Sequence, residues 1–376
     1  MSQAALDAAL AALPIILLAG VAAAIASFVL TPLAIRLAPR LGAIDEPGAK
    51  RRVHQRPIPR SGGLAVVAAF VGVGVAGLLV NELFHFVPAL RAVRFQQLVG
   101  LFAGVAIGGL LGYLDDRLQL RARWQFVSQL ILAGVALMAG VLIDNMVNPL
   151  GGPSIVFGPA AAMAVTTLWI VGMINSANFI DGLDGLLAGV AVIAALTLAF
   201  NSLFVEPIQP VVALLCVLLA GALLGFLPYN FHPARTFLGT GGVFAIGYAL
   251  AVLSVLGTAK VAVALLVLGV PIIDTFWIII RRLSERRSPF SPDRGHFHHR
   301  LLDLGLSHRQ AVLTIYAVGV VLAVLSLALS GRGQLSAFLI IVVVGGLTLY
   351  LVTRRAQGAL DRRSYPDDGP PEEGPA

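Results

Sequence analysis

NFIDGLDG, residues 178–185, is a short polar connection between two long apolar runs, residues 160–177 and 185–204. Asp181 and Asp184 lie in it, and the connection contains no Lys or Arg that could pair with them. Carboxylates so close to hydrocarbon are costly, about 2.5–3.5 kcal/mol each at the centre of a bilayer. A polar turn would explain the stretch, and its two glycines suit one. Because further acidic and His-rich stretches fall on the same membrane face, a metal or phosphate site is favoured.

The composition places the chain among membrane proteins. Hydrophobic residues make up 58% of it and charged residues 12%, with a mean hydropathy of +0.90, whereas charged residues approach about 25% in soluble globular proteins. Apolar runs of membrane-spanning length recur along the chain, which predicts an all-α, polytopic membrane protein. The single cysteine, Cys216, excludes a disulfide within the chain. The net charge of +7 could suggest nucleic acid, but the placement of the charges matters more than their sum, and no nucleic-acid partner is predicted.

Eleven transmembrane helices are predicted in a single integral-membrane domain of residues 1–355. Their ranges are 12–36, 62–80, 97–114, 126–143, 160–177, 185–204, 209–227, 242–257, 260–280, 311–330 and 335–353. Of the 26 Lys and Arg residues, all fall in alternate connections except Arg91, Arg94, Lys260 and Arg332. Because basic loops stay in the cytoplasm, we predict that the N-terminus lies outside and the C-terminus inside. No signal peptide precedes the first span, and the Pro- and acid-rich residues 356–376 are predicted to form a disordered cytoplasmic tail.

Two cytoplasmic connections carry charged motifs. Residues 42–63 hold a basic cluster formed by Lys50, Arg51, Arg52, Arg56 and Arg60. Affinity for anionic lipid explains this cluster as well as attraction of an anionic substrate does. GYLDD, residues 112–116, ends the third apolar run with two adjacent acids. Because Asp115 and Asp116 repel each other, a cation, a metal-bound phosphate or a proton-transfer role explains the pair best.

The central connection could itself hold a metal ion. Asp181 and Asp184 are three residues apart and would share a face if the segment were helical. Asn178 adds a carbonyl oxygen, which is a hard ligand suited to Mg²⁺. NFHPARTFLGTGG, residues 230–242, opens the eighth apolar run. Its backbone N–H groups could bind a phosphate, although a simple connecting turn explains it equally well.

Histidines gather in the long connection of residues 281–305, where His296, His298 and His299 lie beside Arg300. A transition-metal site or a solvated face is the plain interpretation of such a cluster. The connection of residues 281–305 contains no Cys, and no second His pair is evident elsewhere in the sequence. Recognition of phosphate by His and Arg on a loop therefore fits the other motifs better.

Taken together, these motifs resemble those of the polyprenyl-phosphate N-acetylhexosamine-1-phosphate transferases of glycosyltransferase 4 type, which include the phospho-MurNAc-pentapeptide translocase. In the order of that family they read PRSGG at 59–63, GYLDD at 112–116, NFIDGLDG at 178–185, NFHPARTFLG at 230–239, PIIDT at 271–275 and DRGHFHHRLL at 293–302. The resemblance covers about residues 42–353. The HFHHR form and the eleven spans resemble the undecaprenyl- or decaprenyl-phosphate GlcNAc-1-phosphate transferase branch.

The resemblance implies a reaction. A UDP-N-acetylhexosamine, above all UDP-GlcNAc, would donate its sugar-1-phosphate to undecaprenyl or decaprenyl phosphate, release UMP and start a cell-envelope glycan. The reaction would use Mg²⁺, for which Mn²⁺ could substitute. It would take place at the cytoplasmic face of a bacterial plasma membrane, and a homodimer is one assembly that the resemblance allows.

The resemblance also assigns roles to residues. Asp115 and Asp116 would be catalytic, and Asp115 would deprotonate or position the lipid phosphate. The metal would be held by Asp116, Asp181 and Asn178. The donor substrate would be bound by Asp184, His296, His298, His299 and Arg300.

Two positions depart from the family pattern. The family commonly has an Asp that binds Mg²⁺ where this chain has Thr240, and often a Lys where it has Gln125. A Thr hydroxyl brings no negative charge, so the metal would bind more weakly, shift toward Asp116 and Asp181, or activity would be lost. An inactive relative that binds polyprenyl phosphate is therefore one alternative. A transporter or lipid flippase is another, although acids near span ends favour surface chemistry over a transport pathway.

Overall fold

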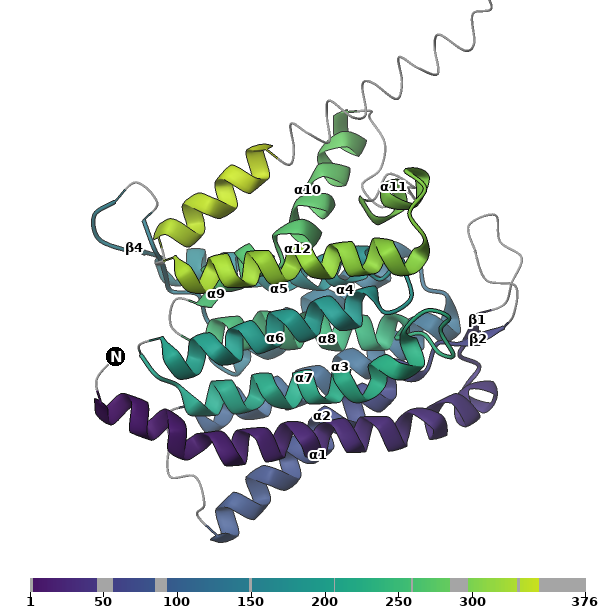
Figure 1. Ribbon diagram of the computed structural model, residues 1–376, viewed down its shortest axis with the longest axis horizontal. Helices are drawn as coiled ribbons and strands as arrows, with labels where there is room; N and C mark the ends of the chain where they lie inside the picture. The colour runs from purple at the N-terminus through teal and green to yellow at the C-terminus, as the bar shows by residue number, and fades with distance from the viewer. Residues whose placement is uncertain are drawn as a thin grey trace, which may run out of the picture.

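In the computed structural model, long helices run side by side, and α10 stands at a steep angle to its neighbours (Figure 1). The structure describes residues 3–45, 57–84, 93–148, 151–205, 207–257, 260–284, 297–329 and 332–344. The helices are α1 (Gln3–Leu41), α2 (Gly62–Phe84), α3 (Phe95–Leu118), α4 (Ala122–Met138), α5 (Pro159–Ile180), α6 (Leu186–Phe204), α7 (Pro210–Asn230), α8 (Gly239–Leu256), α9 (Lys260–Val267), α10 (Gly269–Ser284), α11 (Phe297–Asp303) and α12 (His308–Ala328). A further helix covers Arg332–Val344. Two short antiparallel pairs complete the described elements, β1 (Ile44–Asp45) with β2 (Ile58–Pro59) and β3 (Asn145–Met146) with β4 (Ile155–Val156).

The described helices confirm the prediction of an all-α polytopic membrane protein. Eight of them are long and apolar enough to cross a membrane, namely α1, α2, α3, α5, α6, α7, α8 and α12. The predicted span 126–143 corresponds to α4, which begins earlier, at Ala122, and ends at Met138, before Gly140 takes a left-handed φ of 75°. The predicted span 260–280 is divided between α9 and α10, where Pro271 has no N–H to donate to Val267. The count of eleven and the outward N-terminus stay predictions, as does the cytoplasmic tail, which lies outside the described residues.

Small residues let the helices pack closely. A Cβ on Gly221 of α7 would collide with the Gly20 backbone of α1, and one on Gly112 of α3 would collide with the Thr240 backbone of α8. Such contacts hold helices together in lipid, where apolar surface alone gives little driving force. In α6 and α8, 83% of the most apolar 18-residue window is buried, against 22% in α1. Helices α6 and α8 therefore form the core, and α1 faces the surroundings.

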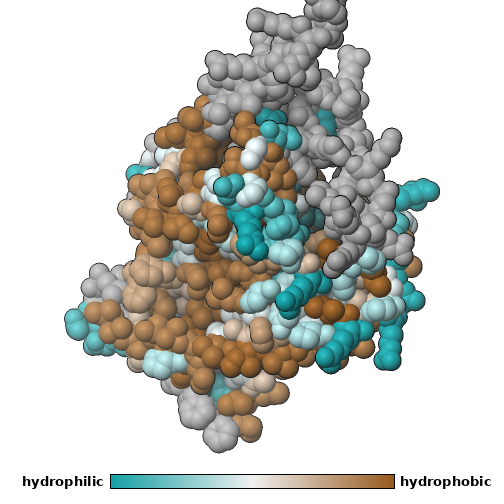
Figure 2. All heavy atoms as spheres, turned by 45° about the vertical axis from the view of Figure 1, so that its right-hand side comes forward, coloured by the Kyte–Doolittle hydropathy of each residue, from teal (hydrophilic) through white to brown (hydrophobic). Residues whose placement is uncertain are grey.

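The connections that carry the motifs meet at one end of the bundle, which we call the motif end. It lies opposite the N-terminus in Figure 1, where β1 and β2 mark it. Backbone hydrogen bonds from Gly62 to the Phe237 carbonyl (3.1 Å) and from Gly63 to the Leu238 carbonyl (3.0 Å) join two of these connections. Figure 2 shows hydrophilic residues gathered on this side of the molecule beside broad hydrophobic flanks. The polar motifs therefore lie together, whereas the flanks suit contact with lipid.

Candidate active site

The acid pair near the end of α3 meets the start of α8. Asp116 Oδ2 accepts a hydrogen bond from the Thr240 backbone N–H (2.8 Å), and Asp116 Oδ1 accepts one from the Thr240 hydroxyl (3.0 Å). The Asp116 side chain is only 4% exposed. Backbone N–H groups at the start of a helix favour an anion. The first turn of α8 therefore stabilises the buried carboxylate.

Gly239 makes this contact sterically possible. Its φ is 66°, in the left-handed region, and a Cβ at this position would collide with the Arg60 carbonyl oxygen and with Asp116 Oδ2. Glycine is the residue that combines this φ with such close approach at little cost. The glycine of the NFHPARTFLG motif thus allows Thr240 to lie against Asp116.

Asp115 has a different partner. Gln125 Nε2, on α4, donates a hydrogen bond to Asp115 Oδ2 (2.9 Å). Asp115 Oδ1 is buried and has no hydrogen-bond partner among the residues that the structure describes. A buried carboxylate oxygen without a donor is costly, and such atoms often mark functional sites. Asp115 Oδ1 is therefore available to a cation or to a protonated group of a substrate.

Arg60 links the acid pair to Asp45. Its Nη2 lies 2.9 Å from Asp45 Oδ1, and its Nη1 lies 3.7 Å from Asp116 Oδ1. The Arg60 side chain is 29% exposed, although both carboxylates are nearly buried. The guanidinium therefore offsets two negative charges and keeps part of its surface accessible to an anion.

Asp181 follows α5 directly, as the residue that caps its C-terminal end. Burial raises the pKa of its carboxyl well above the ordinary value, and the charges of Asp116 and Asp184 raise this pKa further, whereas Arg60 lowers it. The Ala234 N–H, in the connection that leads to Thr240, donates a hydrogen bond to Asp184 Oδ2 (3.1 Å), so Asp181 lies at the same end of the bundle as the acid pair of α3. Asn178 is partly buried and lies about one turn earlier in α5. The roles of these residues as metal ligands stay a prediction.

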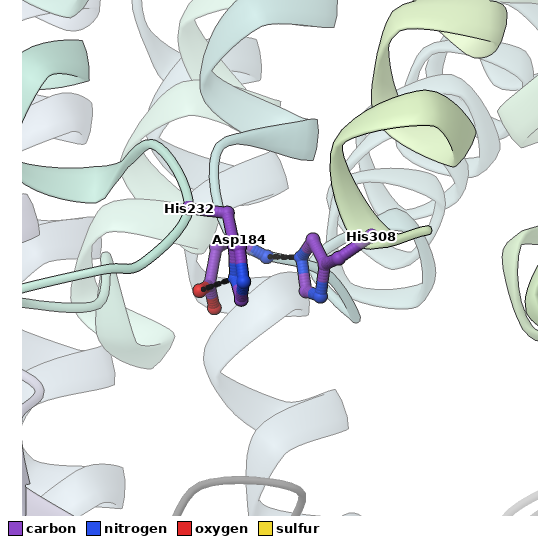
Figure 3. Close-up of side chains that lie close together, drawn as sticks. All are labelled: Asp184, His232 and His308. Carbon is purple, nitrogen blue, oxygen red and sulfur yellow. Dashed lines mark hydrogen bonds and ion pairs between the residues drawn. The ribbon is translucent and has the colours of Figure 1, made fainter. Parts of the chain in front are cut away.

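Asp184 belongs to a cluster with two histidines, shown in Figure 3. Its Oδ2 lies 2.8 Å from His232 Nδ1 and accepts a hydrogen bond from the Ala234 N–H (3.1 Å). Its backbone N–H donates to His308 Nε2 (2.9 Å). The two imidazole rings stack with their centroids 4.1 Å apart. Ligand atoms of these three side chains lie within 4.8 Å of one another. The hydrogen bonds with His232, Ala234 and His308 therefore hold Asp184 in place.

The His-rich loop is described from Phe297 onward. Helix α11 places His298, which is buried, against Gly182. The contact is so close that a Cβ on Gly182 would collide with the imidazole. Arg300 lies half-buried in the same short helix. His296 and the side chain of His299 lie outside the described residues. The structure thus brings one of the predicted donor-binding histidines to the NFIDGLDG connection.

Comparison with known proteins identifies the family. The family model described as glycosyl transferase family 4 matches residues 98–258. A Bacillus subtilis (strain 168) protein named probable undecaprenyl-phosphate N-acetylglucosaminyl 1-phosphate transferase is 38% identical over 84% of this chain and 86% of its own. The chain belongs to glycosyl transferase family 4. The decaprenyl-phosphate N-acetylglucosaminephosphotransferase of Mycobacterium tuberculosis (strain ATCC 25618 / H37Rv) is 37% identical over 92% of this chain and 91% of its own. The phospho-N-acetylmuramoyl-pentapeptide-transferase of Desulforudis audaxviator (strain MP104C) is 33% identical over 85% and 100%.

Membership of glycosyl transferase family 4 confirms the resemblance drawn from the motifs. The structure explains where the two departures from the family pattern lie, because Thr240 and Gln125 both contact the acid pair. Thr240 donates hydrogen bonds to Asp116, and Gln125 donates one to Asp115. In this family member, a neutral donor therefore contacts each carboxylate. Relative to the pattern that the resemblance implies, the two departures remove one acidic and one basic side chain, and both carboxylates keep a hydrogen-bond donor.

The sequence pattern does not single out every residue of this site. His232 stands inside the NFHPARTFLG motif, whose pattern points to backbone N–H groups as the ligands of a phosphate. His308 begins an ordinary capped helix, and no motif marks it. Asp45 lies just before the basic cluster, and an acid at the start of a polar connection is too common to indicate a site. His232 could have been singled out, because a lone His between two apolar runs at the predicted cytoplasmic face is unusual so close to lipid.

Proposed function

We propose that this family member transfers N-acetylglucosamine 1-phosphate from UDP-GlcNAc to undecaprenyl or decaprenyl phosphate. An oxygen of the lipid phosphate would attack the phosphorus bonded to the sugar. The bond from that phosphorus to the UMP oxygen would break, and UMP would leave with the electron pair. The sugar and the acceptor are those in the names of the bacterial relatives, and the UDP donor and the UMP product complete this chemistry.

One observation carries the proposal: charged groups from segments far apart in the sequence meet at the motif end. Arg60 Nη1 lies 3.7 Å from Asp116 Oδ1, and Asp181 follows α5 at the same end of the bundle. His298 lies against the residue that follows Asp181. A transfer between two phosphates needs such a set, because opposite charges must offset the repulsion between the reactants. The placement at one end of apolar helices suits a lipid acceptor and a water-soluble donor.

The residues fit a divalent cation such as Mg²⁺. They offer hard oxygen ligands, which Mg²⁺ prefers, and Asp115 Oδ1 is buried without a donor among the described residues. Asp116, Asp181 and Asn178 would hold the ion, and Mn²⁺ suits the same ligands. When bound, the ion would neutralise charge on the transferred phosphate.

The other side chains would bind and orient the substrates. Asp115 would position the lipid phosphate or accept its proton at Oδ1, while the hydrogen bond from Gln125 fixes the carboxylate. Arg60 would bind a phosphate oxygen through its accessible surface, while Asp45 holds its other side. His298 and Arg300 of α11 would bind the donor phosphates beside Gly182. Positioning would contribute more than proton transfer, because a lipid phosphate is already largely anionic at neutral pH.

The motif end would face the cytoplasm of a bacterial plasma membrane. This orientation rests on the placement of Lys and Arg in alternate connections and on the eleven-span topology. Because Cys216 is buried, a Cys216→Ala background allows single cysteines to be placed at either end. Gln119→Cys should resist an impermeant maleimide in intact cells, whereas Met146→Cys should react. The reverse labelling would place the motif end outside.

A second candidate is an acceptor-binding protein with little or no transfer, and one observation favours it. Thr240 stands where the family commonly has a metal-binding Asp, and it occupies both oxygens of Asp116 with its own donors. A metal ion would therefore have to compete with these hydrogen bonds. Binding of polyprenyl phosphate without release of UMP, and without a gain in Thr240→Asp, would select this candidate.

The test is an assay of the purified protein with UDP-GlcNAc, undecaprenyl phosphate and Mg²⁺, in which UMP and lipid-linked sugar are both measured. Asp115→Asn and Asp181→Asn should each lower turnover by orders of magnitude, because each removes charge from the reacting site. Asp303→Asn, an exposed Asp at the end of α11, is the matched control. Wild-type turnover in both site variants would overturn the proposed roles.

A further inference from the structure

Helix α12 and the connection between α7 and α8 hold the NFIDGLDG connection from outside. His308 Nε2 accepts the Asp184 N–H (2.9 Å), and Asn230 Oδ1 accepts the Gly185 N–H (3.1 Å). The Tyr316 hydroxyl donates to the Gly185 carbonyl. Backbone groups of a loop that have no helical partner are thus satisfied by side chains. Each contact acts on the backbone just after Asp181.

The contact with His308 fixes the state of that imidazole. A nitrogen that accepts a backbone hydrogen bond must carry a lone pair, so Nε2 is unprotonated and the ring hydrogen is on Nδ1. Within the described residues, the Asp184 N–H donates no hydrogen bond to a backbone carbonyl, and His308 Nε2 is the acceptor that satisfies it. Loss of the His308 acceptor would therefore leave a half-buried amide unsatisfied.

His232 holds the same residue from the other side. Its Nδ1 lies 2.8 Å from Asp184 Oδ2, its carbonyl accepts from Arg309 Nε (3.0 Å), and its ring stacks on His308 at an angle of 16°. Two neighbouring residues of α12, His308 and Arg309, therefore contact both the NFIDGLDG connection and the connection before α8. We call Asp184, His232 and His308 the histidine clamp (Figure 3).

A metal ion is a poorer explanation of the histidine clamp than hydrogen bonding. Asp184 Oδ2 already accepts from Ala234, and the Nε2 lone pair of His308 is already used. A metal ion lies in the plane of each imidazole that binds it. The nearly parallel planes of the two rings direct their lone pairs alongside each other, not toward one point. The hydrogen bonds and the stacking of the two rings account for the contacts of the three side chains that the structure describes.

We infer that His308 and His232 are positioning residues, which set the backbone of the NFIDGLDG connection and thereby hold Asp181 beside Asp116. The inference rests on the proposed function, because only the transfer reaction requires Asp181 to be held near Asp116. Helix α12 follows α11, whose His298 lies against Gly182 of the same connection. The clamp therefore ties the His-rich helix and the acid-bearing connection into one unit.

Hydrogen exchange measured by mass spectrometry tests the clamp without any substrate or metal. In the purified protein, the peptide that covers residues 181–185 should exchange about tenfold faster in His308→Leu, because the Asp184 amide loses its acceptor. His308→Gln should keep exchange close to that of the wild type, because its amide oxygen can stand where Nε2 stands. Leu313→Ala, at an exposed position of the same helix, controls for general loosening of α12. Equal exchange in His308→Leu and wild type would overturn the inference.

Kinetics supply the second readout. His308→Leu should lower kcat about tenfold or more with little change in KM for UDP-GlcNAc, and His308→Gln should recover most of the loss. If the wild type released no UMP but the exchange pattern followed the acceptor at 308, the clamp would stand and the proposed function would fail. If Zn²⁺ raised the melting temperature of the wild type but not of His308→Leu, a metal site would replace the clamp.

Discussion

Thr240→Asp is the substitution that probes the site most sharply. The Thr240 hydroxyl lies 3.0 Å from Asp116 Oδ1, so a carboxylate at position 240 would stand about 4 Å from that of Asp116. Two like charges at this separation repel by about 4 kcal/mol at an effective dielectric constant of about 20. Arg60, 3.7 Å from Asp116, offsets part of this repulsion. Without metal, Thr240→Asp should therefore lower the melting temperature.

Mg²⁺ should reverse this loss, because a divalent cation between the carboxylates converts repulsion into attraction. We expect the apparent Mg²⁺ dissociation constant of Thr240→Asp to fall at least about tenfold relative to wild type, and transfer activity to rise at low Mg²⁺. Thermal unfolding across a Mg²⁺ titration measures the first effect, and UMP release measures the second. Thr240→Asn is the matched control, because it has nearly the shape of Asp without the charge. Equal Mg²⁺ responses of the Asp and Asn variants would refute a metal site at Asp116.

Three further predictions concern the same site. The raised pKa of the Asp181 carboxyl means that this group contributes stability that is lost as the pH rises above the ordinary pKa of a carboxyl. Asp181→Asn should therefore raise the metal-free melting temperature at pH 7 while it abolishes turnover. A lower melting temperature would contradict the raised pKa. Arg60→Gln should lower turnover about tenfold to a hundredfold. A double-mutant cycle with Asp45→Asn should show that the effects of the two substitutions on turnover are coupled. Strictly additive effects would contradict the role of Asp45 in holding Arg60. Gly239→Ala should destabilise the fold by about 1–3 kcal/mol, as measured by thermal unfolding, and a neutral effect would contradict the left-handed φ.

Most of the membrane-length helices could be predicted from the sequence, because the length of their apolar runs follows from the thickness of the bilayer. The eight membrane-length helices fall where the apolar runs predict them. The errors arise where the signal is local. Pro271 divides the predicted span 260–280, since its missing N–H weakens the helix in a way that a hydropathy window averages out.

The site could be predicted only in part. Paired acids and a His-rich loop stand out in the sequence, because charged side chains near hydrocarbon are energetically costly and therefore indicate a functional site. The sequence cannot show which groups meet across the bundle. The contact of Gln125 with Asp115 joins residues ten apart, and that of His308 with Asp184 joins residues 124 apart. Such pairings depend on helix packing, which no single motif encodes.

The fate of the phosphorus bonded to the sugar tests the central claim most directly. UDP-GlcNAc labelled with ³²P at that phosphorus would be incubated with the purified protein, undecaprenyl phosphate and Mg²⁺, and the lipid and aqueous phases would be separated. The account predicts that the label moves into the lipid together with the sugar and that UMP appears in equal amount. Label that stays in the aqueous phase as UDP, while the sugar alone enters the lipid, would contradict it.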